Sequence, residues 1–195
     1  EVDTVRKAID RAADGAPDKL ALIHRMARLY STQHHFYASR VADRERRIDA
    51  VEKDNAVEAA ALRKEQGEDE RQALGWLKAT VLEYLLVTKN AASSYPRMDE
   101  ALYELVTLLT EQKREDLARP VFKRLLQDHP ASLLIPDGYL SFGEHFLAEG
   151  RQEDAIKFFT RVLQFPGSRC HRFARYRIGE AFEWLKDCHS ALESY

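Results

Sequence analysis

The sequence reads Tyr139-x-x-Phe142-Gly143-x-x-Phe146, continues through Gly150 to Ala155-x-x-x-Phe159, and reaches Pro166. Bulky apolar residues thus recur at helical spacing on both sides of a Gly-Arg-Gln-Glu-Asp turn. This pattern predicts two amphipathic helices that pack against each other across the turn. Because Gly143 has no side chain, we expect the second helix to approach closely there, with the small Ala155 opposite.

The same spacing recurs on both sides of this helical pair. Downstream, the equivalent residues are Ile178, Gly179, Phe182, Ala191 and Tyr195. Upstream they are Leu102, Leu105, Leu109, Ala118 and Phe122, with Val106 where the glycine would stand and Pro130 closing the unit. A pair of helices cannot bury its apolar face without a neighbour, so three phased copies predict an all-α helical solenoid.

The motif resembles the tetratricopeptide repeat, whose signature is aromatic-x-x-Leu-Gly-x-x-Tyr, later Ala-x-x-x-Phe, then Pro. The central copy departs from it mainly by Tyr139 in place of Trp and Phe142 in place of Leu, which keeps both positions apolar. The resemblance covers residues 98–195 and implies a right-handed solenoid of helical hairpins. We expect regular repeats at about 97–130, 134–167 and 170–195 within a domain spanning 95–195. The last repeat stops at Tyr195, inside its second helix, which suggests a fragment of a longer protein.

Residues 1–94 are expected to form divergent helical repeats. One short helix carries an apolar face and is expected to end at the glycine and proline of Asp14-Gly15-Ala16-Pro17. A second helix begins near Asp18, with His24 where the small glycine would lie. The apolar faces of these two helices consist of Val2, Val5, Ile9 and Ala12, and of Leu20, Ile23, Ala27 and Tyr30.

The segment from about residue 33 to 66 is dominated by alanine and by charges of both signs, which predicts a long, largely solvated helix inserted in the N-terminal half. Gly67 is the expected break. The sparse apolar row is Val41, Ile48, Val51 and Leu62, and the next amphipathic helix uses Trp76, Leu77, Thr80, Tyr84 and Leu85. The charged segment either forms an inserted hairpin arm or pairs with the helix from Asp18 as an oversized second helix. A coiled-coil arm for a partner is the functional alternative, although polar residues interrupt its heptad seam.

Charge and motifs exclude several classes of function. The formal net charge of −2 gives no basic field for nucleic acid, and no run of eighteen apolar residues could span a membrane. The sequence contains no Gly-rich phosphate loop, no Gly-x-Ser-x-Gly, no His-Glu-x-x-His and no Cys-x-x-Cys. We therefore expect a protein that is not an enzyme and that uses no cofactor.

Cysteine and histidine positions do not predict a metal site. Cys170 and Cys188 flank one predicted helix, which separates them by roughly 25 Å at 1.5 Å per residue. That separation excludes a disulfide within one chain and disfavours a shared zinc ion. His34 and His35 lie about three turns from His24, so a packing or solvated role is expected for them.

The resemblance implies a concave surface lined by the first helix of each repeat, with four recurring positions facing it. Position by position, these twelve residues are Glu100, Tyr103, Thr107, Thr110, Asp137, Leu140, Glu144, Leu147, Phe173, Tyr176, Glu180 and Glu183. They include acids and aromatics but no Lys or Arg, which predicts a negative groove for a peptide or protein partner carrying basic residues beside apolar anchors. The alternative is that they are ordinary solvated positions, with the tyrosines packing on the next repeat.

Three roles follow for such a chain: an interaction scaffold, a structural spacer within a longer solenoid, or self-association through the incomplete last repeat.

Repeats of about 36 residues that close in Pro130-x-Ser132 and Pro166-x-Ser168 resemble a bacterial envelope subgroup of the family. That subgroup includes the lipoprotein of the outer-membrane β-barrel assembly machinery and the periplasmic coordinator associated with Tol and Pal. The resemblance implies a periplasmic or outer-membrane-associated location; otherwise a cytoplasmic one is expected. The serines are expected to cap the helices that follow.

Overall fold

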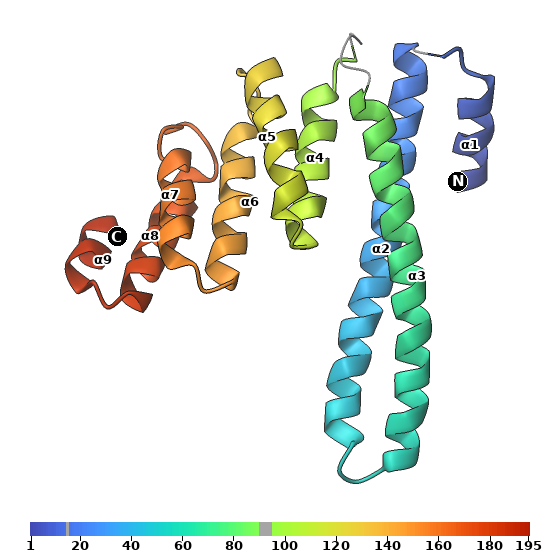
Figure 1. Ribbon diagram of the computed structural model, residues 1–195, viewed down its shortest axis with the longest axis horizontal. Coiled ribbons are helices and arrows are strands. Elements are labelled where there is room, and N and C mark those ends of the chain that lie inside the picture. The colour runs from blue at the N-terminus through green and yellow to red at the C-terminus, as the bar shows by residue number, and fades with distance from the viewer. Residues whose placement is uncertain (15, 90–94) are drawn as a thin grey trace. The chain divides into compact units, whose positions relative to one another are not determined.

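The chain folds entirely into helices over the residues that the structure describes. This computed structural model describes residues 1–14, 16–89 and 95–195, and Pro17 without its side chain. Nine helices and no strands lie in these ranges (Figure 1). The all-α fold predicted from the sequence is confirmed. The chain divides into two compact units, residues 1–96 and residues 97–195.

The first unit is built on two long helices. These are α2 (Pro17–Val51) and α3 (Ala56–Lys89), which run antiparallel as one hairpin, with the short α1 (Val2–Arg11) packed on α2 (Figure 1). Val5 and Ile9 provide the buried face of α1. The predicted glycine stop after this helix, Gly15, lies outside the described residues. The apolar face predicted for the start of α2 is buried and consists of Leu20, Ile23, Ala27 and Tyr30.

His24 fills a core position in this unit, at the place where a repeat would carry glycine. Its side chain is almost completely buried, and Nδ1 lies 2.8 Å from the hydroxyl of Tyr95. The edge of the imidazole also meets the ring of Tyr84. The large imidazole of His24 therefore lies where a glycine would allow close helix contact. Its Nδ1 has a hydrogen-bonding partner, as buried polar groups in folded proteins generally do. His34 is also buried, with Nδ1 3.0 Å from the carbonyl oxygen of Ala73, so it has the packing role, one of the two roles expected for it.

The predicted break at Gly67 is wrong. The turn between the long helices occupies residues 52–55, and Gly67 lies inside α3. Asn55 causes the helix to start here, because its Oδ1 accepts the backbone N–H of Glu58 at 3.1 Å while the Glu58 side chain accepts Nδ2 of Asn55. The first hydrogen bond satisfies one of the backbone donors that a helix start leaves without partners, and the second holds the Asn55 side chain in place.

Apart from α1, the described part of the N-terminal half therefore contains the helices α2 and α3, which form one hairpin. The charged residues lengthen both α2 and α3, so they form the inserted hairpin arm that was one of the two predicted arrangements. A single inserted helix and an oversized second helix do not agree with these bounds. Ile48 and Leu62, predicted as part of a sparse apolar row, are both buried along this hairpin. The charged segment thus forms the end of a two-helix arm, from the second half of α2 through the turn to the first part of α3, and only its outer side is solvated.

A buried ion pair lies within the arm. Asp69 of α3 is buried, and its Oδ2 is in contact with the guanidinium groups of Arg44 and Arg40 of α2. Arg44 also donates to Glu65 Oε2 at 3.0 Å. A carboxylate removed from water in this way depends on its cationic partners.

Asn55→Ala should lower the free energy of unfolding of the arm by about 1 kcal/mol, because the cap of α3 is lost. Amide hydrogen exchange should accelerate in the first turn of α3. Asn55→Asp keeps an acceptor oxygen at the same place and is expected to retain the slow exchange. Unchanged exchange in Asn55→Ala would contradict the capping role.

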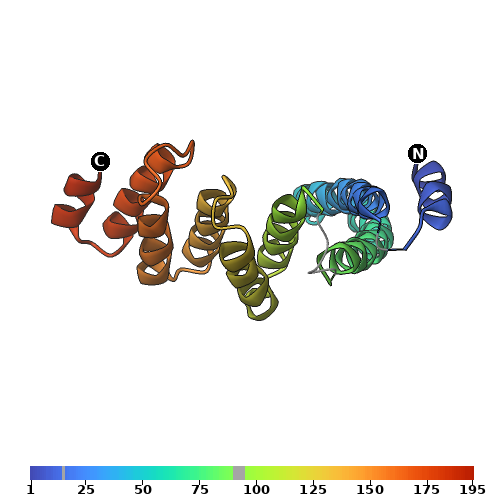
Figure 2. The same ribbon diagram turned by 90° about the horizontal axis from the view of Figure 1, so that it is seen from above.

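The second unit consists of three successive helical hairpins. The first helix of each is called here the leading helix and the second the trailing helix. Figures 1 and 2 show that the helices follow one another in chain order, and each leading helix contacts the next leading helix. The hairpins are α4 (Met98–Glu111) with α5 (Glu115–Asp128), α6 (Ile135–Ala148) with α7 (Gln152–Val162), and α8 (His171–Trp184) with α9 (Cys188–Ser194).

The small residues predicted at helix contacts lie at such contacts. A Cβ atom built on Gly143 would come within 2.3 Å of the Phe159 ring, and one on Gly179 within 2.5 Å of the Tyr195 ring. These two contacts occupy equivalent places in successive hairpins. Gly138 makes a third close approach, to Phe122 of the preceding hairpin, which the sequence pattern does not reveal. Here the glycine permits contact between repeats rather than within one.

Each hairpin turns through the same backbone geometry. A left-handed residue follows every leading helix, namely Lys113 (φ 55°), Gly150 (φ 74°) and Lys186 (φ 60°). The residue after each one donates its backbone N–H five residues back, to Leu109, Phe146 and Phe182 respectively. This is the bonding of a Schellman motif, which satisfies carbonyl groups at the end of a helix.

The serines of the two Pro-x-Ser motifs do not cap the following helices directly. Ser132 Oγ accepts the N–H of Leu134, and Ser168 Oγ accepts that of Cys170, so each serine closes the turn that precedes the leading helix. The residues at the helix starts have no side-chain cap. Ser132 also donates to Asp99 of α4 at 2.7 Å, and thereby connects the first two hairpins.

Candidate functional site

The twelve residues predicted as groove positions all lie on the leading helices α4, α6 and α8. Together they are called here the leading-helix face. Two are buried: Asp137, and Thr110, whose hydroxyl donates to the carbonyl oxygen of Val106. The other ten are at least partly exposed. The second position of each helix carries a large apolar or aromatic side chain that remains partly exposed, in the order Tyr103, Leu140 and Tyr176.

Four of the five acids of this face pair with arginines. Glu100 accepts Arg97 Nε at 2.9 Å, and Asp137 accepts Arg169 Nη2 at 2.6 Å. None of these arginines is among the twelve predicted residues, because they lie between those positions or in the preceding turn. The negative charge of the face is thus smaller than the twelve residues alone predict.

Arg177 forms the largest of these clusters and connects two repeats. Its Nε and Nη2 donate to the two carboxylate oxygens of Glu144 on α6, at 2.6 and 2.5 Å, and its Nη1 donates to Glu180 on α8 at 2.6 Å. The hydrogen bonds that Arg177 donates raise its pKa above the usual range, and those to Glu144 have the largest effect. The guanidinium therefore stays charged and holds α8 against α6.

The tyrosines of the face differ in their surroundings. Burial is the main cause that raises the pKa of Tyr103, and the nearby charge of Asp137 raises it further. Tyr176 is directed towards α9, where its ring lies 5.7 Å from that of Tyr195. The hydroxyl of Tyr195 donates to Glu183 at 3.0 Å. In the third hairpin, Tyr176 and Glu183 therefore contact the trailing helix, while Glu180 contacts Arg177.

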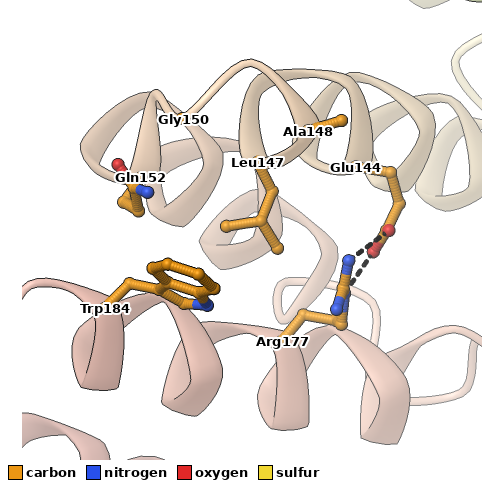
Figure 3. A pocket seen from close by; sticks show the side chains of 7 residues that line it. All are labelled: Glu144, Leu147, Ala148, Gly150, Gln152, Arg177 and Trp184. Carbon is orange, nitrogen blue, oxygen red and sulfur yellow. Dashed lines mark hydrogen bonds and ion pairs between the residues drawn. The ribbon is translucent and has the colours of Figure 1, made fainter.

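A pocket of about 460 Å³ lies between α6, the α6–α7 turn and α8 (Figure 3). We call it the α6–α8 pocket. The indole of Trp184 and the side chain of Leu147 point into it from opposite helices, and the pair of Glu144 and Arg177 lies at its other end. Trp184 is 74% exposed. The pocket is lined by Glu144, Leu147, Ala148, Gly150, Gln152, Arg177 and Trp184.

Arg177 and Trp184 are not among the residues predicted from the sequence. Phe173, Arg177 and Trp184 recur at the spacing of one helix face, so a search of α8 for a second surface row would find them. The family positions single out Tyr176 and Glu183 instead, each one residue before these.

The structure gives the cysteines no common site. Both are free thiols: Cys170 is buried and immediately precedes α8, and Cys188 is exposed and begins α9. Burial is the main cause that raises the pKa of the Cys170 thiol. No group of three or more potential metal ligands occurs among residues 1–14, 16–89 and 95–195.

Comparison with known families supports the repeat assignment. The family model described as tetratricopeptide repeat matches residues 100–132, which comprise most of α4 with α5 and the following turn. No curated protein sequence matches the chain. Repeats of this family generally mediate protein–protein interaction, and the family is typically a non-enzymatic scaffold. Within the described part of the chain, none of the helices has an apolar stretch of the length needed to cross a membrane.

Proposed function

We propose that the leading-helix face binds an extended or helical segment of another protein, and that the chain acts as a non-catalytic scaffold. The observation that carries this proposal is the partly exposed apolar row of Tyr103, Leu140 and Tyr176 at equivalent positions of three stacked helices. A segment lying across the three helices contacts one large apolar or aromatic side chain in each repeat. Such spaced anchors supply the affinity of grooves that recognise peptides.

Charge adds a preference for basic residues in the partner. The leading-helix face has five acids, Glu100, Asp137, Glu144, Glu180 and Glu183. Their arginine partners are Arg97, Arg169 and Arg177, so the acids outnumber these partners. The remaining negative charge attracts Lys or Arg beside the apolar anchors, with an effect that salt weakens.

A wholly polar leading-helix face would favour the structural spacer instead, and the apolar row argues against it. Self-association is a second candidate, favoured by Leu185 and Leu192 of the last hairpin, which are 41% and 77% exposed. The envelope location is the finer part of the proposal and is supported by the resemblance of the Pro-x-Ser repeats alone. The identity of a captured partner tests that location directly.

Site-specific photo-crosslinking tests the proposed function. A photoreactive phenylalanine analogue at Leu140 should crosslink to a discrete partner protein in cells that make the native protein. The matched control is the same analogue at Leu133, which is 88% exposed and precedes α6 outside the leading-helix face. We expect a product from Leu140 and none of the same mass from Leu133.

The mass of the product separates the candidates. A product of twice the chain mass indicates a second copy, and any other discrete mass indicates a different protein. Crosslinking that is equal at both positions, or absent at Leu140, would overturn the scaffold proposal for this face.

A further inference from the structure

The α6–α8 pocket has two chemically different ends. Trp184 and Leu147 face each other across the apolar end, and Figure 3 shows Glu144 and Arg177 paired at the other. A long side chain with an apolar stem and a polar tip matches this division, because such side chains bury their methylene groups and keep the charged group at a polar surface. The sign of the charge at the polar end decides which side chain fits.

The charged end of the pocket carries more negative than positive charge. Each of the three guanidinium nitrogens of Arg177 donates to a carboxylate oxygen of Glu144 or Glu180. One positive group thus faces two negative groups, and the cluster carries a net charge of about −1. An incoming carboxylate would add to this negative charge and be repelled, whereas an incoming cation would offset it.

We infer that the α6–α8 pocket takes a Lys or Arg side chain of the bound protein segment. The stem lies against Leu147 and the indole of Trp184, and the cation lies near the carboxylates of Glu144 and Glu180. An exposed indole also attracts a cation over its face. This inference rests on the proposed function and names the residue that the partner places in this pocket.

The probes are four peptides, acetyl-Ala-Ala-X-Ala-Ala-amide, in which X is Lys, Arg, norleucine or Glu. The chain has two tryptophans, Trp76 in α3 and Trp184 in α8, so a ¹⁵N-labelled sample gives two indole N–H signals. The Trp76→Phe variant assigns them. Lys and Arg peptides should shift the Trp184 signal and leave the Trp76 signal in place. The norleucine peptide should bind about fivefold more weakly and the Glu peptide more weakly still.

Two further measurements separate charge from packing. High salt should weaken binding of the Lys peptide and leave that of the norleucine peptide unchanged. Glu144→Gln should also weaken binding of the Lys peptide, whereas Glu153→Gln, at an exposed position of α7, should not. The peptide series on the unsubstituted protein does not depend on how either variant folds.

Several results would overturn this assignment. They are equal or tighter binding of the norleucine or Glu peptide, equal shifts at both tryptophans, and the lack of any Trp184 shift with Lys and Arg. A crosslinked partner at Leu140 together with an unresponsive Trp184 would refute the pocket assignment alone. A responsive Trp184 without crosslinking at Leu140 would instead refute the proposed function and leave a cation-binding pocket.

Discussion

Arg44→Ala should lower the free energy of unfolding of the first unit by about 2–4 kcal/mol. Arg44 contacts the buried carboxylate of Asp69, and its own side chain is only 13% exposed. Removal of one partner from a buried pair typically costs about 3–5 kcal/mol. Arg40 Nε remains 3.2 Å from Asp69 Oδ2 and offsets part of that loss.

The matched control is Arg46→Ala, two residues further along the same helix. The side chain of Arg46 is 78% exposed and pairs with Asp43 on the surface, so its loss should cost less than about 1 kcal/mol. Urea unfolding followed by the fluorescence of Trp76, in a background where Trp184 is replaced by Phe, reports on the first unit. Equal effects of the two substitutions would show that Asp69 does not depend on Arg44.

Gly143→Ala should destabilise the second unit by about 1–3 kcal/mol. The new methyl group would lie 2.3 Å from the ring of Phe159, which is completely buried. Overpacking of this kind outweighs the benefit that alanine normally brings to a helix.

Gly75→Ala is the control with the same chemical change and the opposite sign. A Cβ atom at Gly75 of α3 has no contact within 4 Å, so the substitution should stabilise the first unit by about 0.5–1 kcal/mol. Trp184 fluorescence, with Trp76 replaced by Phe, follows the second unit. If Gly143→Ala is also stabilising, the close contact with Phe159 does not limit the packing of α6 on α7.

The hairpins of the second unit are predictable because their contacts are local and regular. Gly143 and Gly179 indicate where two helices approach closely, and the aromatic residue that contacts each glycine lies within the same hairpin. The contact of Gly138 with Phe122 joins two hairpins, so the signature of a single repeat does not contain it. Spacing within a helix is a property of the local sequence, whereas contacts between repeats depend on how helices stack.

The long hairpin of the first unit is harder to predict for a different reason. A segment rich in alanine and in alternating charges favours helix along its whole length and carries no strong periodicity. The helix break is then predicted at Gly67, although a single glycine is tolerated inside a helix at a cost of about 1 kcal/mol. The reciprocal pair of Asn55 and Glu58 is the better signal, since it explains why a new helix starts there.

The helices that carry the twelve predicted positions follow from the repeat spacing, whereas the charge around those positions does not. The twelve positions do lie on the leading helices, but Arg97, Arg169 and Arg177 are outside that set and pair with its acids. Arg177 reaches Glu144, which is far from it in sequence, through the stacking of α8 on α6. Charge counted along one helix face therefore overestimates the field that a partner meets.

The shared turn geometry at Lys113, Gly150 and Lys186 has a consequence for how such a chain can grow. Because every hairpin reverses direction in the same way, residues 134–169 form one complete repeat that can be duplicated as a unit. Tandem duplication of the corresponding gene segment would add a copy whose entry and exit already match its neighbours. The duplication joins residue 169 to a second residue 134, which occupies the same place in its repeat as residue 170 does in the next.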